Sequence, residues 1–135
     1  MKKNLLLLIP ALALVFFITS CSKSDTTPPA NSTPSGKWSG WFTPNLGPSR
    51  YFALTFSANG AIAVEANSST TPDIATGTWA LVADSVRATY TYISGATTGT
   101  YSLAGKFSSQ SSIMNGTVGT ASSTTGTGTF TLTKQ

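Results

Sequence analysis

The sequence predicts an all-β protein, a small antiparallel up-and-down barrel of about eight strands in residues 36–135, with a β-sandwich as the alternative. Three observations support this prediction. Short segments of alternating apolar and polar residues recur along this region, separated by Gly, Asn, Pro and Ser clusters. No segment of it shows a helical repeat of useful length. The connections between segments are too short for parallel crossovers, so each strand should pair antiparallel with the next.

Residues 1–20 precede this domain and are expected to be a signal peptide. Two lysines are followed by an apolar run from Leu5 to Ile18 and then by small residues. A charged start, an apolar core and a small-residue cleavage site are typical of a secretory signal. The run is shorter than the roughly 20 residues that a membrane-spanning helix needs, so we expect the segment to be removed.

Cys21 lies at the boundary between this apolar run and a polar segment. The stretch Ile18-Thr19-Ser20-Cys21 resembles the lipobox of bacterial lipoproteins. The resemblance implies that the Cys21 thiol carries a diacylglycerol, that cleavage occurs before Cys21 and that the new amino group is acylated. It also implies the outer membrane as destination, because Ser22 follows the cysteine. Each buried CH₂ contributes about 0.8 kcal/mol, so several acyl chains would attach the protein stably.

The alternatives to lipidation are a free secreted protein with an unpaired thiol and an uncleaved N-terminal helix. Cys21 is the only cysteine, so the domain has no disulfide and depends on packing. Net charge is +4 for the whole chain and falls to +2, six basic against four acidic residues, without the two leading lysines. This small, scattered excess argues against a nucleic-acid partner.

Residues 21–35 carry the cysteine and a disordered tether of small polar residues and prolines. This segment has no large apolar side chain, so it cannot repay the entropy lost on ordering. Asp25-Thr26-Thr27 in the tether, and Asp84-Ser85-Val86 in the domain, resemble O-glycan acceptor sites of the Bacteroidota. The resemblance makes Thr26 and Ser85 candidate glycosylation residues and suggests a source in that phylum.

The strands of the domain are expected, in order, around residues 37–42, 51–56, 61–65, 79–81, 86–92, 101–107, 113–118 and 130–132. Asn59-Gly60 separates the second from the third and predicts a type I′ hairpin turn with positive φ at both residues. A tight turn is expected near Asp84. The side chains expected inside the barrel are Trp38, Phe52, Leu54, Phe56, Trp79, Leu81, Tyr90, Tyr92, Tyr101, Phe107 and Phe130.

Gly36-Lys37-Trp38 opens the first strand and resembles the Gly-x-Trp start of lipocalins and related calycin barrels, including the avidin-like ones. In those families the tryptophan closes one end of the barrel, so the resemblance implies this role for Trp38. Gly77-Thr78-Trp79 repeats the tripeptide before another strand. The simpler interpretation is that both tryptophans are core aromatics.

An eight-stranded barrel is just wide enough to fill with side chains or to hold one small ligand. The many large aromatics favour filling. Several tyrosines among them favour a semi-polar cavity, because buried phenols need hydrogen-bond partners. The candidate lining residues for a small hydrophobic ligand are Trp38, Trp79, Tyr90, Tyr92 and Tyr101.

Trp41 and Tyr51 flank the loop 43–49 and are expected to point away from the interior. Exposed aromatics beside a polar loop can stack on sugars or pack on a protein partner. This pair defines the alternative function, a surface domain of β-sandwich type that interacts with proteins or glycans.

Groups for catalysis are scarce, since the chain has no histidine and the domain has only three acids. Glu65 is expected on the outer face, Asp73 in the loop 67–74 and Asp84 in a turn, where acids commonly bond locally. No His or Cys ligand set and no Asp-x-Asp loop indicates a metal. We therefore expect no enzyme activity, metal or cofactor. The prediction is an outer-membrane lipoprotein whose barrel is a non-catalytic binding or structural module.

Overall fold

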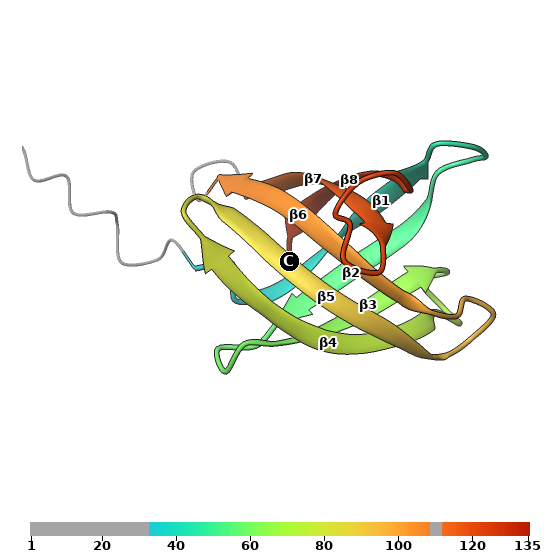
Figure 1. The fold of residues 1–135 in the computed structure, drawn as a ribbon, viewed down its shortest axis with the longest axis horizontal. Coiled ribbons are helices and arrows are strands. Elements are labelled where there is room, and N and C mark those ends of the chain that lie inside the picture. Colours follow the sequence, from blue (N-terminus) through green and yellow to red (C-terminus); the bar gives the residue numbers. More distant parts are fainter. Residues whose placement is uncertain (1–32, 109–111) are drawn as a thin grey trace, which may run out of the picture.

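The computed structural model of the protein describes residues 33–108 and 112–135. It contains eight strands, β1 (Gly36–Pro44), β2 (Arg50–Phe56), β3 (Ala61–Asn67), β4 (Asp73–Val82), β5 (Ser85–Ser94), β6 (Thr100–Ser108), β7 (Ile113–Thr120) and β8 (Gly128–Lys134). Each strand pairs antiparallel with the next, and β8 pairs with β1 to close a barrel (Figure 1). The predicted up-and-down barrel is confirmed, and it forms in place of the alternative sandwich.

The predicted signal peptide, the lipobox with Cys21, and Thr26 lie outside the described residues. Within the ranges 33–108 and 112–135, no helix is long and apolar enough to cross a membrane.

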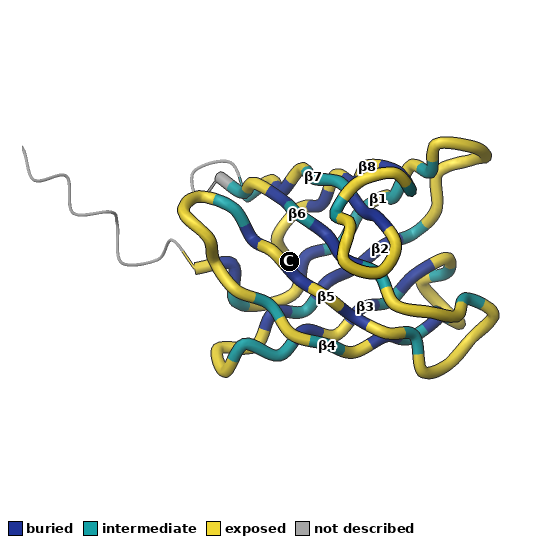
Figure 2. The backbone as a smooth tube through the Cα atoms, viewed as in Figure 1, coloured by how far each residue is buried: buried dark blue, intermediate teal, exposed yellow. Residues whose placement is uncertain are grey.

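Alternation along the strands places one face of each in the interior, as Figure 2 shows for the tube of the backbone. In β3, Ile62, Val64 and Ala66 are buried, and Ala63 between them is exposed. A period of two is what a sheet with one packed face requires. The predicted inner aromatics all belong to the resulting core or pack against it, namely Trp38, Phe52, Phe56, Trp79, Tyr90, Tyr92, Tyr101, Phe107 and Phe130.

One end of the barrel, here called the tether end, is formed by the start of β1 and the turns 57–60 and 83–84. Trp38 lies buried there, and its indole Nε1 donates a hydrogen bond to the carbonyl oxygen of Pro34 at 2.7 Å. Phe107 packs edge-on against Trp38, with ring centroids 6.1 Å apart. Trp79 contacts Phe56 in the same way at 5.4 Å. These aromatics fill the tether end.

Two local predictions at the tether end were wrong. The turn at Asn59-Gly60 is not type I′, because only Gly60 takes a positive φ, of +83°. Instead, the Gly60 amide donates a hydrogen bond to the Ser57 carbonyl, and the Ala61 amide donates one to the side-chain oxygen of Asn59. The connection is therefore a longer loop, with glycine at its left-handed position. Leu81 is 44% exposed, because β4 runs on to Val82 at the rim of the tether end, where fewer side chains cover it.

Candidate ligand site at the open end

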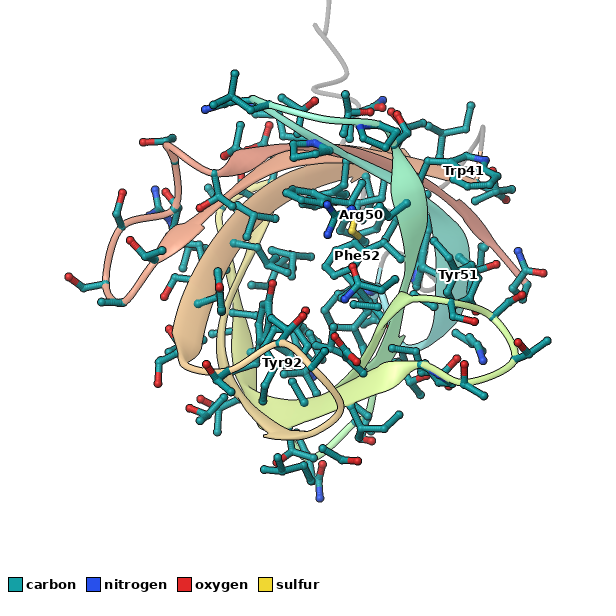
Figure 3. The ribbon with its side chains drawn as sticks, turned by 90° about the vertical axis from the view of Figure 1, so that its right-hand side faces the viewer. Trp41, Arg50, Tyr51, Phe52 and Tyr92 are labelled. Atoms are coloured by element: carbon teal, nitrogen blue, oxygen red, sulfur yellow. The ribbon has the colours of Figure 1, made fainter. Side chains whose placement is uncertain are left out.

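The opposite end of the barrel, here called the open end, is formed by the turns 45–49, 68–72, 95–99 and 121–127. A cavity of about 190 Å³ lies within it. Its apolar lining includes Phe52, Ala66 and Val118, which are buried. Figure 3 looks into this end, with Arg50, Phe52 and Tyr92 inside the ring of strands and Trp41 and Tyr51 outside it. The open end therefore differs from the filled tether end.

Three tyrosines form a cluster on the wall of this cavity. Tyr90 and Tyr92 are two residues apart on β5 and so face the same way, and Tyr101 of β6 is the cross-strand partner of Tyr90. The rings of Tyr90 and Tyr101 stack at 6.1 Å with an interplanar angle of 17°. Tyr92 packs edge-on against Tyr101 at 5.5 Å. Strand register alone thus brings the three phenols together.

The phenol hydroxyls of this cluster are available as hydrogen-bond donors. Burial raises the pKa of Tyr90 and of Tyr92 far above the ordinary value of 10.0, so both stay protonated at neutral pH. Among the described residues, no buried side-chain oxygen or nitrogen lacks a hydrogen bond. The hydroxyls of Tyr90, Tyr92 and Tyr101 bond to no other described residue, so they must be open to the cavity.

Asp73 was predicted in a loop but is the first residue of β4 and is only 7% exposed. Its carboxylate accepts hydrogen bonds from the backbone amides of Ala96 and Thr97, both at 2.9 Å, and from the side chains of Thr97 and Asn67. These hydrogen bonds, above all that of the Thr97 hydroxyl, lower the pKa of Asp73 to about 2. The buried carboxylate anchors the turn 95–99, which carries Thr97 at the cavity.

Arg50 places a positive charge at the mouth of the cavity. It lies two residues before Phe52 on β2 and therefore points to the same inner side (Figure 3). Its only side-chain hydrogen bond to the described part of the chain runs from Nη1 to the Asn67 side-chain oxygen, at 3.5 Å. The two ion pairs of residues 33–108 and 112–135 join Lys37 to Glu65 and Lys106 to Asp84, so Arg50 pairs with no carboxylate of these residues.

The other predicted site residues are spread over the molecule. Trp38 and Trp79 fill the tether end and do not line this cavity, whereas the three tyrosines do. Ser85 follows the turn 83–84 at the tether end, half-buried, and its hydroxyl donates to Asp84 at 3.1 Å.

The three acids of the domain are also separated, since Glu65 lies on the outer face, and Asp73 and Asp84 lie at opposite ends. Groups of three or more acidic, His or Cys side chains suited to a metal are absent from the described residues.

Trp41 and Tyr51 form a directly registered pair between β1 and β2 on the outer wall. Trp41 is 61% exposed. The Tyr51 hydroxyl lies 3.3 Å from the Glu65 carboxylate, which also pairs with Lys37 at 2.9 Å. Trp41 does not line the cavity at the open end, whereas part of Tyr51 reaches its rim.

Sequence reasoning missed several residues of the open end. Arg50 was detectable, because it continues the inward phase of Phe52, but the strand was expected to begin one residue later. The cluster of Asn67, Asp73 and Thr97 was not detectable. Its hydrogen bonds join the end of β3, the start of β4 and the turn after β5. No local pattern predicts such a long-range cluster.

The fold and this site define the protein as a small, closed, eight-stranded antiparallel barrel that is filled at one end and hollow at the other. Compared with known proteins, the chain matches no protein-family model, no curated protein and no solved structure.

Proposed function

We propose that the protein is a bacterial lipoprotein, held at the outer membrane through lipid on Cys21, whose lipocalin-like barrel binds a small hydrophobic ligand without catalysis. The lipobox supports the anchor. The candidate O-glycan sites at Thr26 and Ser85 support a source in the Bacteroidota. The cavity at the open end supports the ligand and is the single observation on which this function rests.

The volume of the cavity limits the ligand. A cavity of about 150 Å³ in another protein is large enough to bind benzene, and drug-sized ligands occupy roughly 300 Å³ or more. The 190 Å³ here therefore fits a single ring or a short branched chain. Because the described chain enters at the tether end, the mouth of the cavity lies at the end opposite the anchor, accessible to ligands from solution.

The ligand proposal is tested by calorimetric titration of the mature protein, reconstituted in nanodiscs, with benzyl alcohol. We expect binding with a dissociation constant on the order of 0.1–1 mM, which is ordinary for so few atoms. Val118→Phe should abolish binding, because the larger ring would fill the cavity. Trp41→Ala, on the outer wall, is the control and should bind as the unaltered protein does. Absence of heat with the folded, unaltered protein would overturn the ligand site.

The anchor is tested separately by replacing Cys21 with Ala. We expect the variant to lose partitioning into the detergent phase of a Triton X-114 extract, and its precursor to remain uncleaved. A variant that is processed and partitions as before would show that Cys21 carries no lipid.

A second candidate function is interaction with a glycan or protein through the outer wall. It is favoured by the exposure of Trp41, whose neighbour on β8 is the short side chain of Thr131 and leaves the indole accessible. Titration with neutral oligosaccharides, followed by tryptophan fluorescence, tests the glycan. A spectral shift that disappears in Trp41→Ala but persists in Val118→Phe would support it, and no shift would count against it.

A further inference from the structure

On the basis of the proposed ligand site, we propose that the ligand carries a small anionic head group, such as a carboxylate, held between Arg50 and the tyrosine hydroxyls at the open end. The apolar part of the ligand would lie against Phe52, Ala66 and Val118.

Unsatisfied donors at the mouth are the first argument. A guanidinium has five N–H donors and no acceptor. The Arg50 side chain makes one hydrogen bond to the described residues, at 3.5 Å, the weak limit of such a bond, so most of these donors are left for a ligand or water. The hydroxyls of Tyr90, Tyr92 and Tyr101 add three more groups that can donate. A ligand rich in acceptors matches this arrangement best.

Charge is the second argument. Asp73 lies close to this part of the barrel, and its negative charge contributes to the raised pKa of Tyr92. Its carboxylate already accepts hydrogen bonds from Ala96 and Thr97 of the turn 95–99 and from the Asn67 side chain at the end of β3. Among the described residues that line the cavity, Arg50 is the one charged side chain. A carboxylate can accept two parallel N–H bonds from a guanidinium, which fixes its orientation as well as its affinity.

The arrangement of the lining along β2 is the third argument. Arg50 is the first residue of the strand, and Phe52 lies two residues further into the barrel beside Ala66. A ligand would therefore enter with its apolar part leading and leave its charged group at the rim, partly solvated. This order avoids the large cost of burying a charge completely. A ring carboxylate of the size of benzoate satisfies both the volume and the polarity.

The test compares benzoate, benzyl alcohol and benzylamine, which share a ring and differ in charge. Each is titrated at pH 7 into the mature protein in nanodiscs of zwitterionic lipid, with heat as the readout. We expect benzoate to bind at least tenfold more tightly than benzyl alcohol, and benzylamine to bind most weakly. Added salt should weaken only benzoate.

Variants locate the effect. Arg50→Gln should weaken the binding of benzoate about tenfold and leave the affinity for benzyl alcohol unchanged. Tyr92→Phe should weaken the binding of benzoate by several-fold. Arg87→Gln removes an exposed cation from β5, outside this cavity, and should change neither ligand.

Two results would refute the anionic head group, and both can be distinguished from a result that refutes the ligand site itself. Equal binding of benzoate and benzyl alcohol, or an unchanged benzoate affinity in Arg50→Gln, would refute the anionic ligand but leave the proposed function standing. If none of the three compounds binds to the folded protein, the ligand site itself is refuted.

Discussion

Glycines on the inner face of the barrel provide the space in which Phe130 lies. Gly116 of β7 is the cross-strand partner of Phe130 on β8, and Gly105 lies next to Gly116 on β6. A Cβ built on Gly116 would overlap the Phe130 ring and the carbonyl oxygen of Ala104. The aromatic ring can therefore lie across two strands only because these positions have no side chain.

The first prediction concerns this contact. Gly116→Ala should lower the free energy of unfolding by about 2 kcal/mol, because an extra carbon in a filled core forces ring and backbone to shift. Urea unfolding followed by far-ultraviolet circular dichroism measures the change. Thr117→Ser, the next residue and on the outer side, should change it by less than about 0.5 kcal/mol. Equal effects of the two substitutions would show that the inner glycine is not needed for packing.

A second prediction concerns Ala83, which takes a φ of +55° in the turn between β4 and β5. This backbone region is costly for residues with a Cβ, so Ala83→Gly should stabilise the protein by about 0.5–1 kcal/mol. Ala80→Gly is the control, because Ala80 lies in β4 without a positive φ. It should destabilise by about the same amount, since glycine loses more entropy in a strand. Thermal melts of the two variants should shift in opposite directions.

Among the structural elements, the turn 95–99 depends on a residue from another strand. Asp73 of β4 accepts hydrogen bonds from the backbone amides of Ala96 and Thr97, which lie beyond the end of β5. Its side chain also packs directly against Gly95, where φ is +103° and a Cβ would meet the carboxylate. The carboxylate thus holds a turn whose Thr97 lines the cavity.

The third prediction is a dependence of stability on pH. The pKa of Asp73 is about 2 in the folded protein against an ordinary 3.8, so its stabilisation is complete above about pH 4 and is lost as pH falls towards 2. Asp73→Asn should therefore be less stable than the unaltered protein at pH 7, and the difference should shrink between pH 4 and pH 2. Urea unfolding at a series of pH values measures it.

Asp84→Asn is the matched control for Asp73. Asp84 lies in an exposed turn and pairs with Lys106 of β6, and such surface ion pairs contribute little to the free energy of unfolding. We expect its removal to change stability much less at pH 7. If the two variants behave alike, the buried hydrogen bonds of Asp73 are not what stabilises the open end.

For the whole molecule, closure depends on β8, which pairs with both β7 and β1. An open sheet would present two unpaired edges, and such edges promote association with other chains. In the closed barrel, packing protects the inner faces of the strands and pairing protects their edges.

The fourth prediction is that a chain ending at Gly126, without β8, loses its cooperative thermal transition and forms oligomers. Size-exclusion chromatography with light scattering measures the association. Removal of Gln135 alone is the control and should leave a cooperative transition at nearly the same temperature, because only one backbone bond to Lys37 is lost. A monomeric, cooperatively melting chain without β8 would refute the role of closure.

Much of the barrel was predictable, because a period of two and short connections are local properties of the chain. The alternation around Phe52, Leu54 and Phe56 was sufficient to identify β2 and its inner face. β4 was predicted too short, since within Asp73–Val82 only Asp73 and Ala75 are buried. Small and hydroxylated residues give little signal even when main-chain pairing holds them in a strand.

The candidate site was predictable only in part. The three tyrosines were predicted as lining residues because the alternation of their strands places them on the inner face. Whether Trp38 and Trp79 line the same cavity depends on which end of the barrel each tryptophan occupies. A residue's distance along the strand sets that end, and the strand boundaries were the least accurate part of the prediction. The tryptophans fill the tether end, and the tyrosines line the open end.

The sequence by itself determined the all-β class, the antiparallel order and the inner faces, because these follow from spacing between near neighbours. It is also the only basis for the lipobox at Cys21. The tertiary structure alone decided closure by β8, the anchoring of the turn 95–99 by Asp73, and the cavity in which Arg50 faces the tyrosines. The physical reason is that these features join residues distant in the chain, and their geometry exists only once all eight strands are paired.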